Sequence, residues 1–206
     1  MLRLSAITLK LATVLESSVH LLLIESKLMA LKAIIYKADL QLADMDRNHF
    51  HNYSLTIACH PSETEIRMMV RLLAFALNAS DDLIFTKGIS TDNEPDIWRK
   101  NLTDEIELWI DLGQPDEKRL RKACGRAKQV VVYTYQNRTA DVWWKQIESS
   151  IQRFDNLSVI SFDENSCNSL QQLVNRNMQL QCTIQDGECW LTDGTSSSHI
   201  KLHQRK

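Results

Sequence analysis

The feature that most constrains the fold is a helical segment, residues 61–78, that carries apolar side chains on two of its faces. Pro61 marks its start, and so does Ser62 with Glu65 three residues later, the spacing of a capping box. Two apolar stripes then recur at helical spacing: Ile66, Met69, Val70, Leu73 and Leu77 form one, and Met68, Leu72 and Phe75 form the other. Because both stripes must leave water, we expect other elements to cover this helix on two sides.

Strand patterns lie on both sides of this helix in the sequence. Residues 31–43 and 53–59 show strand periodicity and flank the polar run 44–52, which predicts an N-terminal hairpin. Residues 96–100 and 105–113 flank the turn sequence NLTD and predict a second hairpin. The alternation in the second of these strands places its carboxylates on one face.

A third hairpin is expected near the C-terminus, around the turn dipeptide at residues 186–187. An Asp-Gly turn there pairs Cys182 with Leu191 and Ile184 with Cys189, so the two cysteines share a face but sit diagonally. The chain has five cysteines, none in a CxxC pair or with zinc spacing. An odd number of cysteines in a domain of this size favours reduced thiols and a cytoplasmic protein.

The middle of the chain follows the order helix, three strands, helix, strand. After the helix at 61–78 come a short strand at 82–88 and the second hairpin, and then a basic helix at 115–128 and a strand at 129–135. Three further elements are expected: a helix capped by Thr139, a strand at 157–162 and a helix at 166–175. We therefore predict one α/β domain with a mixed sheet over residues 29–193, followed by a flexible tail at 194–206.

Composition narrows the classes of function. The 206 residues are 44% hydrophobic and 24% charged, as in ordinary globular domains. The formal net charge is -2, so binding to nucleic acid would need a local basic patch. The sequence lacks the GxGxxG, GxxxxGK[ST], GxSxG and HExxH motifs, which gives no support to a metabolic enzyme of those classes.

The first 28 residues are rich in leucine, but Lys10, Glu16 and His20 interrupt the apolar run. What remains is too short for a secretory signal and for a membrane span, so we expect no membrane association. We interpret residues 1–28 as a helix-prone extension outside the domain.

The order of elements from 61 to 135, α-β-β-β-α-β, is similar to the core of the PD-(D/E)xK nuclease-like (restriction-endonuclease-like) fold, here with N-terminal and C-terminal hairpins added. Pro95-Asp96 matches the PD dipeptide, and Asp111 with Gln114 stands where the (D/E)xK motif is expected. The sequence departs from the motif at Gly113, which takes the place of the lysine. The departure puts catalytic activity in doubt.

A longer resemblance starts at Met29. The segments MALKAIIYKADLQLADMDRN, HPSETEIRMMVRLLAFALNA, FTKGISTDNEPDIW, ELWIDLGQPDEKRLRKACGRAKQVVVYTY and ADVWW look like the YaeQ family of small bacterial proteins. This resemblance implies a single-domain PD-(D/E)xK-like fold in the cytoplasm, with no settled biochemical activity. It also implies that residues 1–28 lie outside the family.

The resemblance to a nuclease fold predicts a divalent metal site, because Mg²⁺ or Mn²⁺ needs two or three carboxylate oxygens and an open position for water. Asp96 and Asp111 are the first candidates as metal ligands, and Glu63 at the start of the long helix is the third. If the NLTD turn pairs Lys100 with Glu105, Asp96 lies diagonal to Asp111, at roughly 7–8 Å between backbone positions.

Catalysis would assign roles to the same two aspartates and to three further residues. Gln114 would position a water molecule or a phosphate oxygen, and Lys118 or Lys122 would stabilise the developing negative charge. The alternative is that these side chains form ordinary solvated faces, and the same choice applies to the basic helix from Lys118 to Lys128 as a nucleic-acid contact. Two functional hypotheses follow: a metal-dependent nuclease, and a non-catalytic descendant that binds nucleic acid or a protein partner in gene expression.

Overall fold

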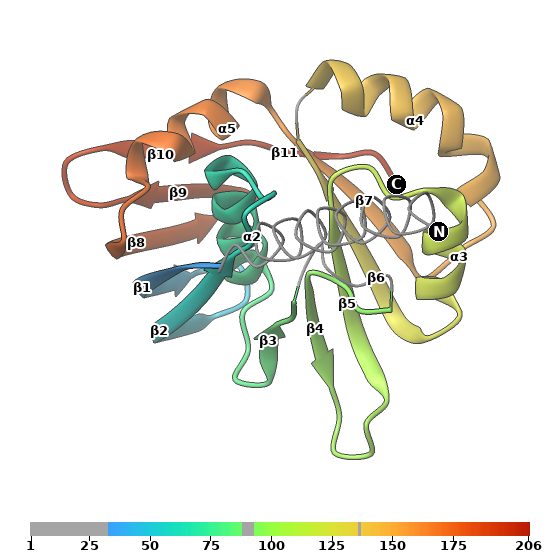
Figure 1. Cartoon of the computed structure of the whole chain (residues 1–206), viewed down its shortest axis with the longest axis horizontal. Coiled ribbons are helices and arrows are strands. Elements are labelled where there is room, and N and C mark those ends of the chain that lie inside the picture. Colours follow the sequence, from blue (N-terminus) through green and yellow to red (C-terminus); the bar gives the residue numbers. More distant parts are fainter. Residues whose placement is uncertain (1–32, 88–92, 136) are drawn as a thin grey trace, which may run out of the picture. The chain divides into compact units, whose positions relative to one another are not determined.

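The structure, a computed structural model, describes residues 33–87, 93–135 and 137–206. The extension predicted at residues 1–28 lies outside the described residues. The described part of the chain contains a five-stranded sheet, here called sheet A, and a six-stranded sheet, here called sheet B (Figure 1).

Sheet A joins the two ends of the domain. Its strand order is β10-β9-β8-β1-β2, with the bounds β1 Ile34–Asp44, β2 His49–Cys59, β8 Asn177–Gln185, β9 Glu188–Thr192 and β10 Ser197–Ile200. The N-terminal hairpin is β1 and β2, and the C-terminal hairpin is β8 and β9. The two hairpins meet where β1 runs parallel to β8.

The C-terminal hairpin has the predicted register. Cys182 pairs with Leu191 and Ile184 with Cys189 across the turn. The two cysteine sulfur atoms lie 3.5 Å apart inside the core. The turn dipeptide therefore fixed the pairing, as expected for a two-residue hairpin loop.

Sheet B carries the central elements. Its order is β11-β7-β6-β5-β4-β3, with the bounds β3 Leu83–Phe85, β4 Ile97–Lys100, β5 Ile106–Leu112, β6 Ala127–Thr134, β7 Leu157–Phe162 and β11 Leu202–Gln204. Strands β5, β6 and β7 are parallel, and α3 (Glu117–Cys124) and α4 (Asn137–Ile151) connect them. The carboxyl ends of these three strands therefore meet at one edge of sheet B.

The helix predicted at 61–78 is α2 (Glu65–Leu77), and it is covered on two sides, as its two apolar stripes predict. Nine consecutive residues of α2, from Met68 to Ala76, are buried. They share one core with inward-facing residues of sheet A and with one face of sheet B. The predicted order of helix, three strands, helix and strand is observed as α2, β3, β4, β5, α3 and β6.

A second core lies on the other face of sheet B. Trp109 of β5 and Val132 of β6 pack there against α3 and α4, with Leu120 and Trp143 among the buried residues. Helix α5 (Glu164–Leu170) and the 3-10 turn η2 (Gln171–Leu173) follow β7 and join the first core. None of the helices in the described ranges is long and apolar enough to cross a membrane.

The structure differs from the sequence-based expectations at two helix starts and in the C-terminal tail. Thr64, not Ser62, caps α2, because its hydroxyl accepts a hydrogen bond from the Arg67 amide at 3.2 Å. Helix α4 begins before Thr139, at Asn137. Residues 197–204, expected within a flexible tail, form β10 and β11, because buried Ile200 joins the core and β11 pairs with β7.

The cap assignment can be tested by stability. We expect Thr64→Ala to lower the free energy of unfolding by about 1 kcal/mol, because an amide in the first turn of α2 loses its acceptor. Ser62→Ala is the matched control, since Ser62 is exposed and its hydroxyl contacts the His60 ring instead. Urea denaturation of both variants would contradict the assignment if Ser62→Ala had the larger effect.

Candidate functional site

The three candidate metal ligands come from three separate segments, and two of them share one arginine. Glu63 precedes α2, Asp96 precedes β4, and Asp111 lies in β5. All three are buried, at 8%, 3% and 1% exposure respectively. Arg67 of α2 donates from Nη1 to Glu63 Oε1 at 2.8 Å and from Nη2 to Asp96 Oδ1 at 2.7 Å. One guanidinium therefore connects two of the three carboxylates.

The register of β4 and β5 differs from the expected one. Lys100 pairs with Ile106 and not with Glu105, and an irregularity follows Arg99. The reason is the turn: Asn101 Oδ1 accepts the Glu105 amide at 3.0 Å, which holds Glu105 in the loop.

The shifted register changes the position of the two aspartates. Ile97 pairs with Ile110, so the same register continued by one residue places Asp96 opposite Asp111 rather than diagonal to it.

Asp111 has its own arginine. Arg119 of α3 donates from Nε to Oδ2 at 2.8 Å and from Nη2 to Oδ1 at 2.7 Å, which is the bidentate geometry of a strong charge-assisted pair. Burial raises the pKa of the Asp111 carboxyl, Arg119 opposes that shift, and the nearby charge of Asp96 adds to it. The ion pair with Arg119 therefore stabilises the ionised form of Asp111 against the effect of burial.

Arg71 completes the network on the side of sheet A. Its Nη2 donates to Glu63 Oε2 at 2.9 Å and to the Ala58 carbonyl at 2.7 Å. Burial alone would lower the pKa of Arg67, but the charges of Asp96 and Glu63 outweigh it and raise that pKa. The ion pairs form two groups whose formal charges together cancel, and both are here called the network: Arg71, Glu63, Arg67 and Asp96 in one, and Arg119 with Asp111 in the other.

The network leaves little room for a metal ion. Each of the six carboxylate oxygens accepts a hydrogen bond, from a guanidinium in five cases and from the Leu112 amide at 2.9 Å in the case of Asp96 Oδ2. A divalent cation would have to displace guanidinium groups that carry the same sign of charge. Among the residues that the structure describes, no group of three or more His, Cys, Asp or Glu side chains has a metal-holding arrangement. As arranged, these residues do not fit Mg²⁺ or Mn²⁺.

The proposed catalytic residues after β5 lie outside the network. Gly113 has a φ of +91°, which turns the chain out of the sheet and exposes Gln114. Gln114 Nε2 donates to Thr139 Oγ1 at 2.8 Å, at the start of α4. Lys118 is exposed, with no hydrogen bond or ion pair to the described residues, and Lys122 donates to the side chain of Asn93. Of these three residues, only Gln114 therefore contacts the start of α4.

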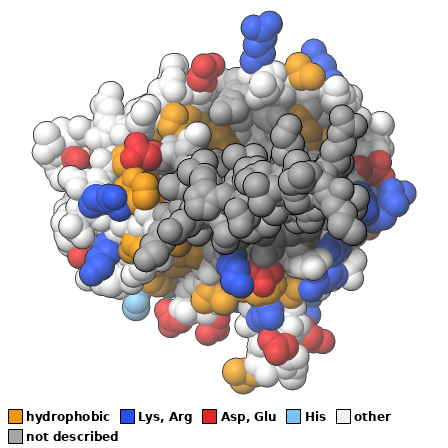
Figure 2. Space-filling model, viewed as in Figure 1, with side chains coloured by type: hydrophobic (Ala, Val, Ile, Leu, Met, Phe, Trp, Pro, Cys, Tyr) orange, Lys and Arg blue, Asp and Glu red, His pale blue; other side chains and the backbone are white. Residues whose placement is uncertain are grey.

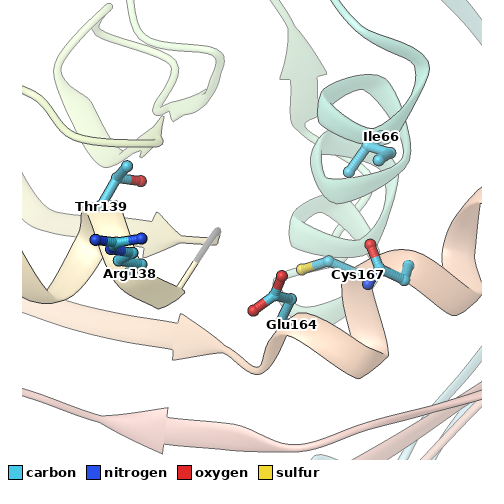
Figure 3. Close-up of a pocket in the computed structure, with 6 residues that line it drawn as sticks. Ile66, Arg138, Thr139, Glu164 and Cys167 are labelled. Atoms are coloured by element: carbon cyan, nitrogen blue, oxygen red, sulfur yellow. The ribbon is translucent and has the colours of Figure 1, made fainter.

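A cavity of about 340 Å³ opens between the starts of α4 and α5 and the first turn of α2. Arg138 and Thr139 line one wall, Glu164 and Cys167 line another, and Ile66 faces them from α2 (Figure 3). Burial raises the pKa of Tyr135 to about 12, and Arg67 and Cys167 are among the groups whose charges act on it.

In the basic segment from Lys118 to Lys128, expected to contact nucleic acid, three of the six basic residues pair with acids: Arg119, Arg121 and Lys128. Glu117 accepts from both Arg121 and Arg153, at 2.6 and 2.9 Å. Lys128 lies 3.4 Å from Glu105 and 3.7 Å from Glu107. Figure 2 shows blue and red side chains interspersed around the rim of the face in view.

Comparison with known proteins identifies the family. The family model described as YaeQ protein matches residues 29–202. The chain belongs to the YaeQ family. The protein named uncharacterized protein YaeQ of Escherichia coli K12 is 48% identical over 174 residues, which are 84% of this chain and 96% of that protein.

Two crystal structures of YaeQ proteins are similar. The one from Xanthomonas axonopodis pv. citri has a TM-score of 0.82 and 46% identity, over 84% of this chain and 98% of that one. The one from Pseudomonas syringae has a TM-score of 0.81 and 32% identity, over 84% of this chain and 96% of that one. The mixed α and β fold with mixed sheets is thus a fold of YaeQ proteins.

Sequence reasoning found the carboxylates of the YaeQ-family chain but missed their arginine partners. The signal for two of them was present, because Glu63, Arg67 and Arg71 follow one another at intervals of four residues along one edge of the helix. No comparable spacing signals that Arg119 reaches Asp111, since the pairing depends on how α3 packs on β5.

The Arg119–Asp111 pair can be tested with a double variant. We expect Arg119→Met to lower the free energy of unfolding by about 3 kcal/mol, because it leaves a buried carboxylate unpaired. Adding Asp111→Asn should return more than about 1 kcal/mol, because the unpaired charge is removed. Urea denaturation measures both effects, and a double variant no more stable than the single one would contradict the pairing.

The pH dependence of the same two variants gives an independent reading. A carboxyl whose pKa is raised in the native state lowers the free energy of unfolding as the pH rises above the ordinary carboxyl pKa of 3.8. Without Arg119 the pKa of Asp111 rises further, so the deficit of Arg119→Met relative to the double variant should grow from acidic pH towards neutral pH.

Proposed function

We propose that this protein is a non-catalytic nucleic-acid-binding member of the PD-(D/E)xK-like fold. The superfamily placement is supported by the element order from α2 to β6 and by the convergence of Glu63, Asp96 and Asp111 near one edge of sheet B.

The single observation that carries the non-catalytic reading is the pairing of all six carboxylate oxygens. A nuclease of this type needs free carboxylate oxygens to hold the ion and an open position for the attacking water. Here Arg67, Arg71 and Arg119 occupy the inner side of the three acids. A nuclease would require at least Arg119 and Arg67 to swing away, which leaves the buried Asp111 and Asp96 without a guanidinium partner, while Glu63 keeps Arg71.

The binding surface that we propose lies beside this network, where the chain leaves β5 and enters α4. The Gln114–Thr139 hydrogen bond holds these two segments together, and the Trp143 indole also donates to the Pro115 carbonyl at 2.9 Å. Two exposed cations flank the junction: Lys118 from the first turn of α3 and Arg138 from the first turn of α4. Neither is paired with an acid among the described residues, so both can meet phosphate groups.

The remaining features of the junction suit a phosphodiester backbone. The amides at the start of α4 favour negative charge, since that end of a 15-residue helix carries the positive end of its dipole. Contacts from Lys118 and Arg138 to phosphate groups would carry no sequence information, so we expect binding that does not depend on the base sequence.

Binding can be measured by fluorescence anisotropy with labelled single-stranded DNA, duplex DNA and RNA. We expect Lys118→Ala with Arg138→Ala to weaken binding about tenfold or more at low salt and to lower the slope of log affinity against log salt by about one for each cation removed. Lys37→Ala is the control, because this exposed lysine lies on sheet A. Equal effects of the control and the double variant would contradict the proposed surface.

Catalysis is tested separately with the same nucleic acids in Mn²⁺ and in Mg²⁺. We expect no cleavage and no change in affinity when EDTA is added, because the carboxylates already hold arginines. The test variant is Asp111→Asn. Its matched control is Asp104→Asn, at an exposed turn position. Cleavage by the wild type and Asp104→Asn that is lost in Asp111→Asn would overturn the non-catalytic reading, whereas cleavage that survives in all three is contamination.

A further inference from the structure

Strand β2 is an open edge of unusual length for this molecule. It runs for 11 residues, pairs with β1 along its whole length, and has no ladder partner on its other side among the described residues (Figure 1). The strands at the other three sheet edges are β10, β3 and β11, with four, three and three residues. Within the described part of the chain, only β2 therefore presents a long open edge, on which the Ala58 carbonyl already accepts a hydrogen bond from Arg71.

Sheet proteins usually protect such an edge with charged side chains, proline or a bulge. The sequence of β2, HFHNYSLTIAC, contains no Lys, Arg, Asp, Glu or Pro. Its register with β1 runs without a shift from His49 to Cys59, so no bulge twists the edge away. An edge without these protections is suited to pairing with another strand.

We propose that β2 pairs antiparallel with β2 of a second copy of this chain, about a two-fold axis at Ser54. Ser54 is the central residue of the strand, so this register uses all 11 residues of each copy. The two five-stranded sheets would then form one continuous sheet across the dimer. A two-fold arrangement of this kind closes on itself and needs one surface only.

The outer face of the strand is self-complementary in this register. Phe50 stands opposite Ala58 of the partner subunit, and within each copy Ala58 pairs with Ile35 of β1. Phe50 is 60% exposed and Ile35 is 48% exposed in one copy. Pairing places Phe50 beside the small side chain of Ala58 of the partner subunit, with Ile35 one strand further on, so that apolar side chains line the outer face on both sides of the axis.

The inner face and the charges are also compatible with self-pairing. Tyr53 and Leu55, both half-buried, stand opposite Leu55 and Tyr53 of the partner subunit. No like charges meet at the seam because β2 has no charged residue, and the nearest charges on the outer face are Lys37 and Asp39 of β1, which have opposite signs. A partner of strong charge has nothing on this strand to recognise, which favours a second copy.

The test uses two variants that change the same two exposed positions. In the proposed register Asn52 stands opposite Thr56 of the partner subunit, and both side chains point outward. Asn52→Lys with Thr56→Lys sets lysine against lysine twice across the axis, whereas Asn52→Asp with Thr56→Lys sets aspartate against lysine. Sedimentation velocity over a wide concentration range, with the full chain, measures the oligomeric state.

We expect the wild type and the Asp/Lys variant to be dimeric and the Lys/Lys variant to be monomeric, with the difference reduced at high salt. In the dimeric proteins, the amides of β2 that point away from β1 should exchange hydrogen slowly. A wild type that stays monomeric at every concentration would overturn the proposal and leave the edge to a strand of another protein. Two equally dimeric variants would also overturn it, because the interface would then lie elsewhere.

Discussion

The guanidinium of Arg67 is the contact on which the seating of α2 against sheet B depends. It joins Glu63, which precedes α2, to Asp96, which precedes β4, and all three groups are largely buried. Loss of one partner of a buried ion pair is strongly destabilising, so this shared contact favours one position of α2 relative to β4. Apolar packing places α2 between the sheets, but it allows small shifts of the helix. A guanidinium that is hydrogen-bonded to two carboxylates allows fewer such shifts. The network therefore sets the position of the helix, and the core supplies most of the stability.

The parts of the fold that could be predicted from the sequence are those in which a local pattern decides the structure. The two stripes of α2 required cover on two sides, and the turn at Asp186 and Gly187 fixed the partners of Cys182 and Ile184. The parallel pairing of β1 with β8 could not be predicted, because the paired residues are about 140 positions apart and no turn connects them. The prediction of the β4–β5 register was wrong because of one local contact. The side chain of Asn101 accepts the Glu105 amide and keeps Glu105 in the loop, which strand propensity does not indicate.

The candidate site divides in the same way. The sequence showed that acidic side chains lie on neighbouring strands and at a helix start, because alternation and spacing are local properties. It did not show what stands between them. In the sequence, an aspartate that binds a metal looks the same as one that pairs with an arginine. The tertiary packing determines which cation lies next to it. Arg119 reaches Asp111 because α3 crosses the face of β5 that carries Trp109 and Asp111, and that crossing is a tertiary feature.

The neutrality of the network bears on where this YaeQ-family protein can meet a partner. Three acids and three arginines cancel, so the buried site presents no net charge to a polyanion or to a cation. Two basic residues of α3 are also paired with acids, Arg119 with Asp111 and Arg121 with Glu117. What remains for recognition is whatever the chain leaves unpaired: Lys118 and Arg138 around the Gln114–Thr139 junction, and the uncharged backbone edge of β2. These two surfaces belong to different sheets and need different chemistry, so occupation of one does not require the other.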